Sequence, residues 1–185
     1  MFELVHTPIA GCYEIQPRVL SDQRGCFVKT FHRAEFAARG LQLDFDEEYY
    51  SVSHAGVIRG LHFQLPPMDH VKLVYCVSGE VFDAVVDLRL GSPTYGQSFS
   101  STLSASHGNG LYIPKGLAHG FAVTSELAIL TYKVATAYSP THDAGILWNS
   151  AGIAWPIADP ILSSRDQSFV SLSHFQSPFH FQSHD

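Results

Sequence analysis

The chain has 185 residues, of which 45% are hydrophobic and 15% charged, and its formal net charge is −6 with histidine neutral. These values indicate one globular domain over residues 1–185, and the aromatic and β-branched content favours an all-β fold. With no basic cluster, nucleic acid is not an expected partner. No apolar run reaches the ~18 residues of a membrane span and no basic, apolar leader opens the chain, so we expect a cytoplasmic protein without a membrane partner.

The predicted elements are short strands separated by Gly and Pro turns. Strands are expected within residues 1–20 and at 26–31, 57–64, 71–77, 80–90, 97–103 and 127–134, with one short helix at 32–39 that Gly40 ends. Strands at roughly ten-residue spacing indicate a sandwich or barrel. Residues 167–185 form a tail in which Phe175, Phe179 and Phe181 are expected to dock on the barrel or to fray with the last residues.

The strand at residues 80–90 has the clearest alternation in the chain. Phe82, Ala84, Val86 and Leu88 share one face, and Asp83, Asp87 and Arg89 share the other. The acidic and aromatic run at residues 44–50 is predicted to be either a solvated edge strand or one wall of a site.

Charged and polar side chains gather between residues 56 and 72. His62 has the strand parity of Ile58 and Gly60, whereas Lys72 has that of Val74 and Cys76. On apolar sheet faces such groups are costly unless they are paired or used. A satisfied core histidine and a snorkelling lysine remain the simpler alternative, but the further presence of Arg59, Gln64 and His70 favours a functional site.

The segment from Gly108 to His119 resembles the second short motif of the cupins, a superfamily of jelly-roll barrels. Gly108, Pro114 and Gly116 set the turn that would swing His119 into the barrel. The first cupin metal motif is missing, because His62 and His70 are eight residues apart and no glutamate follows at the required distance. A Zn, Fe or Mn site of His62, His70 and His119 is a minor alternative.

A larger set of motifs resembles the dTDP-4-dehydrorhamnose 3,5-epimerase family. The set comprises DQRGCF (22–27), GVIRGLHFQ (56–64), HVKLVYCVSGEVFDAVVDLR (70–89), GSPTYG (91–96), IPKGLAHGF (113–121), YKVATAYSP (132–140) and SSRD (163–166). The resemblance implies a jelly-roll, cupin-type barrel with short peripheral helices. It also implies a homodimer that acts on a nucleotide-linked 4-keto-6-deoxyhexose without metal or organic cofactor.

The chemistry of such a sugar explains the residue types. C3 and C5 flank the C4 ketone, so epimerisation needs a base on one face, stabilisation of the enolate oxygen, and an acid on the other face. By resemblance, His62 is the base, oriented and made more basic by Asp166; Lys72 holds the enolate oxygen; and Tyr132 is the proton donor on the opposite wall. His62 and Lys72 are expected on adjacent strands.

The resemblance also implies a set of substrate-binding residues. Arg24, Arg59, His119 and Arg165 match positions that hold the diphosphate and sugar, Tyr138 matches an aromatic that stacks on the base, and Asp143 stands where the family usually has Glu. Two departures concern the same surface: Lys29 replaces a glutamate, and Glu47-Glu48-Tyr49 replaces Gln-x-Asn.

These departures leave the substrate open. We expect dTDP-4-keto-6-deoxyglucose, with a GDP- or CDP-linked sugar or a C3-only reaction as alternatives. A 3,4-ketoisomerase or a non-catalytic sugar-binding cupin is less favoured, because the catalytic set is intact.

Overall fold

The computed structural model describes residues 2–42 and 44–182. The strands are β1 (Phe2–His6), β2 (Tyr13–Pro17), β3 (Val19–Asp22), β4 (Gly25–Val28), β5 (Glu47–His54), β6 (Ile58–Gln64), β7 (Lys72–Ser78), β8 (Glu80–Asp87), β9 (Ser98–Ser104), β10 (Gly110–Ile113), β11 (Leu117–Val123), β12 (Leu127–Val134) and β13 (Asp143–Gly145). Two short helices, α1 (Arg33–Ala37) and α2 (Ser164–Gln167), and a 3₁₀ turn (Leu172–His174) accompany them. No described helix is long and apolar enough to cross a membrane.

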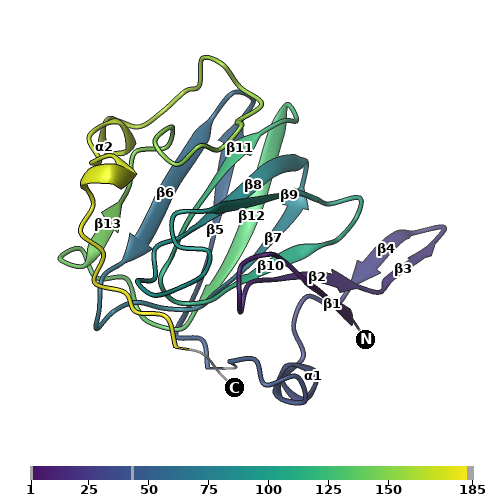
Figure 1. Ribbon diagram of the computed structural model, residues 1–185. Helices are drawn as coiled ribbons and strands as arrows, with labels where there is room; N and C mark the ends of the chain where they lie inside the picture. Colours follow the sequence, from purple (N-terminus) through teal and green to yellow (C-terminus); the bar gives the residue numbers. More distant parts are fainter. Residues whose placement is uncertain (1, 43, 183–185) are drawn as a thin grey trace.

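Two antiparallel sheets face each other and form a jelly-roll barrel of the cupin type (Figure 1). One has the strand order β1-β2-β10-β7-β12-β5, and the other has the order β13-β6-β11-β8-β9. Apolar side chains from both sheets fill the space between them, among them Val74, Leu130, Val81, Val85 and Phe121. The all-β jelly roll with short helices predicted from the sequence is confirmed.

The two sheets also correct one expectation about neighbouring strands. β6 pairs with β11 and β13, whereas β7 pairs with β10 and β12 in the other sheet. His62 and Lys72 therefore do not lie on adjacent strands as expected. The turn at Pro66-Pro67 carries the chain across the barrel, so the two residues face each other from opposite sheets.

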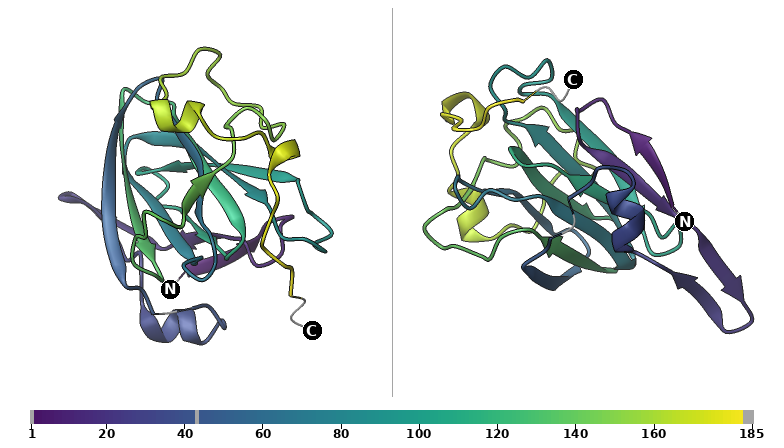
Figure 2. Two further views of the ribbon diagram at one scale, coloured as in Figure 1. Left: turned by 90° about the vertical axis from the view of Figure 1, so that its left-hand side faces the viewer. Right: turned by 90° about the horizontal axis from the view of Figure 1, so that it is seen from below.

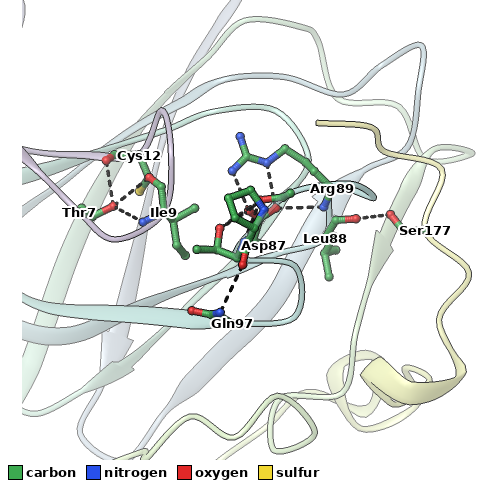
Figure 3. Close-up of polar contacts among 11 residues, drawn as sticks. Thr7, Ile9, Cys12, Asp87, Leu88, Arg89, Gln97 and Ser177 are labelled. Carbon is green, nitrogen blue, oxygen red and sulfur yellow. Dashed lines mark hydrogen bonds and ion pairs between the residues drawn. The ribbon is translucent and has the colours of Figure 1, made fainter. Parts of the chain in front are cut away.

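The two faces predicted for β8 do not separate a buried side from an exposed one: both are buried, and the face with Asp83 and Asp87 turns toward the barrel interior. Asp83 and Asp87 are fully buried and Arg89 is nearly so. Figure 3 shows Asp87 bonded to Arg89, whose Nε and Nη2 donate to the two carboxylate oxygens, each over 2.8 Å. A buried charge persists only when it is paired and hydrogen-bonded in this way.

The C-terminal tail docks beside this ion pair. Ser177 donates to the carbonyl of Leu88, also seen in Figure 3, and Phe179 is buried against the barrel. The ring of Phe181 lies 5.0 Å from the Arg89 guanidinium carbon. The expected docking of phenylalanines is therefore confirmed, and the expected fraying of the last residues concerns 183–185, outside the described residues.

A bulge in β6 decides which of its side chains face the barrel interior. His119 of β11 is opposite His62, but Phe121 is opposite Arg59, so β6 carries one extra residue between the two pairs. Arg59 and His62 thereby face the same side, which strict alternation forbids. A Cβ on Gly60 would lie 2.6 Å from the Cα of Gly120, so only glycine permits this close approach.

The β3–β4 hairpin projects away from the barrel in every view, while α1 packs beneath the six-stranded sheet (Figures 1 and 2). The helix predicted at 32–39 corresponds to α1, which buries Phe36 against Phe2. The hairpin instead leaves Leu20 and Phe27 exposed. This arm contributes nothing to the core between the two sheets.

Candidate active site

A cavity of about 430 Å³ lies between the two sheets and collects most of the predicted site residues. Its lining comprises Glu47, Tyr49, Ser51, Arg59, His62, Phe63, Gln64, His70, Lys72, His119, Phe121, Tyr132, Val134, Tyr138, Asp143 and Arg165. The predicted base and the predicted proton donor come from opposite sheets, His62 from β6 and Tyr132 from β12.

His62 and Asp166 form a hydrogen-bonded dyad. The Nε2 of His62 lies 2.8 Å from Oδ1 of Asp166, and the backbone N–H of Gly60 donates to Oδ2 over 3.0 Å. Asp166 is positioned by α2, whose N-cap Ser163 accepts the Asp166 backbone N–H over 3.0 Å. Burial works to raise the pKa of Asp166, but these hydrogen bonds together lower it, so the carboxylate is ionised.

The protonation of His62 follows from this geometry. An ionised Asp166 requires a hydrogen on Nε2, which leaves the lone pair on Nδ1 as the basic atom. Burial lowers the pKa of His62 below its usual value, although Asp166 opposes the shift. The expectation that Asp166 makes the ring more basic holds for this one contact, but the net direction is opposite because burial is the larger effect. The ring is thus neutral and ready to accept a proton at neutral pH.

Lys72 brings a buried ammonium into the cavity. Its Nζ donates to the carbonyl of His62 over 3.3 Å, across the barrel from β7 to β6. Burial lowers the pKa of Lys72 to about 8, while the carboxylates of Asp143 and Asp83 act to raise it. The ammonium therefore stays charged at neutral pH and is sparsely satisfied, which suits a group that stabilises developing negative charge.

Tyr132 supplies a buried hydroxyl on the wall opposite His62. It is 7% exposed, and its hydroxyl lies 3.4 Å from Oγ of Ser51. Burial raises its pKa further above the usual value, so the phenol keeps its proton until a strong base is formed nearby. The ring of Tyr49 stacks on it, with centroids 4.9 Å apart and an interplanar angle of 19°.

His119 is paired with a carboxylate that the sequence reasoning did not assign to the site. Its Nε2 lies 3.0 and 2.9 Å from the two oxygens of Asp83, and both side chains are buried. The alternation in β8 placed Asp83 on the polar face, yet nothing in the sequence showed that this face is the interior. Gln64 was also missed as a structural partner: its side-chain oxygen accepts the N–H of Ser139 and so holds the loop that carries Tyr138.

The remaining predicted binding residues in the cavity lie at its rim. Arg165 donates to Asp143 over 2.7 Å, and Tyr138 donates to the same carboxylate over 3.2 Å. Tyr138 is 58% exposed, so its ring is accessible from solvent. Arg59 is tied to β5 by a 2.9 Å bond from its Nε to Oγ of Ser53.

Three predicted binding residues lie outside the cavity lining. Arg24 pairs with Asp22 on the projecting hairpin, and its side chain is 85% exposed. Lys29 is exposed just after β4. Glu48 points to the outer side of β5, where it pairs with Lys133. In this chain alone, these residues are not brought to the site.

The three histidines of the alternative metal site have separate partners. His62 bonds Asp166, His119 bonds Asp83, and His70 bonds Oγ1 of Thr136 over 2.8 Å. Burial, with the nearby Lys72 and Lys115, lowers the pKa of His70 to about 3, so this loop histidine is neutral. Over residues 2–42 and 44–182, no group of three or more His, Cys, Asp or Glu side chains is placed to hold a metal ion.

Comparison with known proteins identifies the family of this chain. The profile of the dTDP-4-dehydrorhamnose 3,5-epimerase family matches residues 6–174. The chain belongs to this family. The dTDP-4-dehydrorhamnose 3,5-epimerase of Shigella flexneri is 42% identical over 178 residues, which cover 93% of this chain and 98% of the relative.

Two further relatives are named for different reactions within the family, one a 3,5-epimerase and the other a 3-epimerase. The crystal structure of the Legionella pneumophila 3,5-epimerase in complex with dTDP-4-keto-L-rhamnose has a TM-score of 0.94 and 34% identity, and the match covers 99% of this chain and all of that one. The dTDP-4-dehydrorhamnose 3-epimerase of Streptomyces niveus is 40% identical over 89% of this chain and 81% of its own length. The chain is accordingly an isomerase of the epimerase class, as the sequence motifs predicted.

Proposed function

We propose that this epimerase inverts C3 and C5 of dTDP-4-keto-6-deoxyglucose through enolate intermediates. The observation that supports it best is the arrangement of three groups around one cavity. A neutral His62 held by Asp166 faces the phenol of Tyr132 across the barrel, and the ammonium of Lys72 lies beside His62. A base, an acid on the other side and a fixed positive charge are the groups that this chemistry requires.

Each inversion then runs as two proton transfers. Nδ1 of His62 takes the proton from the carbon beside the ketone, and the electron pair moves to the C4 oxygen, where Lys72 stabilises it. Tyr132 gives its proton to the opposite face of the same carbon, and the ketone re-forms. Solvent returns a proton to the phenolate and removes one from the imidazolium. Asp166 stabilises that imidazolium and stays ionised throughout.

The residues at the rim of the cavity are suited to bind the nucleoside diphosphate part of the substrate. Arg59 and Arg165 are guanidinium groups that match phosphate oxygens in geometry and charge. Arg165 is held by Asp143, and Tyr138 leaves its ring accessible to a base. The relatives named for dTDP sugars favour thymidine over guanosine or cytidine in the nucleotide.

The test is solvent exchange on the intact protein. In deuterated water, dTDP-4-keto-6-deoxyglucose should acquire deuterium at C3 and C5 and yield the inverted product by NMR. Label at C3 alone would assign the narrower activity named for the Streptomyces niveus relative. A 3-keto product would indicate a ketoisomerase, and no exchange with dTDP-, GDP- and CDP-linked sugars alike would refute the proposal.

We also propose that the protein works as a homodimer in which the hairpin reaches a second copy. Leu20 is 48% exposed and Phe27 61% exposed on an arm that leaves its own barrel, and a partner surface would cover both. Arg24 on the same arm then has a diphosphate within reach only in the other subunit. Mixing Arg24→Ala and His62→Ala chains should restore activity if the sites are shared, whereas no recovery in a mixed dimer contradicts sharing.

A further inference from the structure

The strongest further feature is the aromatic pair at the mouth of the cavity. Tyr49 of β5 and Tyr132 of β12 are directly opposite each other in the antiparallel ladder. Their rings are nearly parallel and in contact, with centroids 4.9 Å apart. Tyr49 is 44% exposed and Tyr132 only 7%, so Tyr49 lies between the proposed proton donor and solvent.

Resting on the proposed function, we infer that Tyr49 is a positioning residue that holds the Tyr132 ring in the one orientation from which its hydroxyl reaches the reacting carbon. The inner side of the Tyr132 ring is packed in the core and meets the His119 ring edge-on, with centroids 6.2 Å apart, while its hydroxyl has only the 3.4 Å contact with Ser51. The stacked ring of Tyr49 therefore provides the principal restraint on the exposed side. An offset-stacked aromatic pair fixes the plane of both rings.

This restraint is a property of this chain's sequence. The position of Tyr49 is one where the family resemblance led us to expect asparagine, and an amide cannot stack over the whole face of a phenol. Partial burial, with Glu47 and Asp143 nearby, raises the pKa of Tyr49 to about 12, so it remains a neutral ring and does not compete as a proton source. Its contribution is thus shape and exclusion of water.

A misplaced proton donor has a distinct chemical signature. His62 can still remove the proton and return one to the face it came from, which exchanges hydrogen without inverting the carbon. Inversion needs Tyr132 on the other face. The ratio of deuterium in unconverted substrate to deuterium in epimerised product therefore reports the placement of Tyr132, and it does not depend on how tightly substrate binds, because both outcomes start from one complex.

The experiment compares Tyr49→Ala and Tyr49→Asn with Tyr49→Phe, which keeps the ring, and with Tyr132→Phe as the reference for exchange without inversion. We expect this ratio to rise roughly three- to tenfold in Tyr49→Ala and Tyr49→Asn, because each loses the contribution of one stacked aromatic pair. The ratio should stay at the wild-type value in Tyr49→Phe. Equal loss of exchange and inversion, or an unchanged ratio, would overturn the inference.

A second readout needs no turnover. Ring-flip rates of ¹³C-labelled tyrosine, with the Tyr132 signal assigned by its disappearance in Tyr132→Phe, should increase in Tyr49→Ala and not in Tyr49→Phe. Equal rates in all three chains would refute the positioning role. If the wild-type chain neither exchanges nor inverts the sugar, the proposed function fails, and the ring-flip comparison still decides whether Tyr49 restrains Tyr132. Thermal unfolding of each variant confirms that the barrel is intact.

Discussion

Replacing Asp166 by asparagine should keep the shape of the dyad while it removes the negative charge and changes the tautomer of His62. The amide is nearly the same shape and can still accept the Gly60 N–H that now bonds Oδ2 over 3.0 Å. It cannot neutralise an imidazolium, and its NH₂ group facing Nε2 would favour the tautomer that carries hydrogen on Nδ1, where the base must be free.

The size of the effect follows from the contact that is lost. A hydrogen bond to a charged group contributes about 1.5–3 kcal/mol, so the turnover number should fall roughly 10- to 150-fold from this contact alone. The change of tautomer lowers the turnover number further. In serine proteases, an Asp-to-Asn change behind the catalytic histidine lowers the turnover number by ~10⁴-fold. Thermal stability should change little, because the amide fills the same space.

The pH profile gives the sharper test. In the proposed mechanism His62 acts when neutral, so activity should fall as pH drops through its pKa, which burial already lowers. Asp166 raises that pKa, and its removal should move the acidic limb of kcat/KM to still lower pH while the plateau falls. Asp143→Asn is the matched control: it removes a carboxylate that lines the cavity and bonds Arg165, and it should raise KM without moving the acidic limb. An unchanged plateau, or an acidic limb moved to higher pH, would refute the assignment.

Three further outcomes test other parts of the molecule. In the proposed mechanism Lys72 acts as a cation, so activity should fall as pH rises through about 8. Asp83→Asn removes a carboxylate that raises the pKa of Lys72 and should move this basic limb of the pH profile to lower pH, whereas an unmoved limb contradicts the coupling. In Tyr132→Phe the rate of inversion should fall by about 10²–10⁴-fold, while solvent exchange measured by NMR is retained. Loss of both would contradict the role of Tyr132 as the acid. Gly116→Ala should reduce the free energy of unfolding by about 1–2 kcal/mol for its φ of +81°, plus about 1–3 kcal/mol because the new Cβ lies 2.6 Å from Cγ of Arg89. Gly152→Ala, at φ +68° with open space around it, should show the first cost alone in urea denaturation, and equal losses would contradict the overpacking.

Local pattern predicted the strands well and their partners poorly. Leu127–Val134 has the same bounds in the prediction and in β12, because alternating burial leaves a period-two signature in the residues themselves. The pairing of strands depends on contacts between residues that are far apart in the sequence, so the local pattern does not predict it. His62 and Lys72 were expected on adjacent strands, whereas β6 and β7 lie in different sheets and the chain crosses between them at Pro66-Pro67.

The site residues that belong to family motifs could be predicted from the sequence. The direction of a side chain could not be predicted where the backbone departs from regular alternation. Family motifs led to the residues His62, Lys72 and Tyr132, all of which line one cavity, and to Asp166, which bonds His62 behind it. Strict alternation would put Arg59 on the face opposite His62, and the one inserted residue in β6 that brings them to the same face cannot be read from composition or spacing.

The position of α2 in the chain has a consequence for synthesis. The last strand ends at Gly145, and the helix that carries Asp166 begins at Ser164. During translation from the N-terminus, His62, Lys72 and Tyr132 leave the ribosome well before the carboxylate that orients the base. A chain that ends between residues 145 and 164 would thus contain every strand from β1 to β13 but lack Asp166, so the N–H of Gly60 would have no carboxylate to accept it. Under the proposed mechanism, proton abstraction by His62 is therefore the last part of the site to be completed during synthesis.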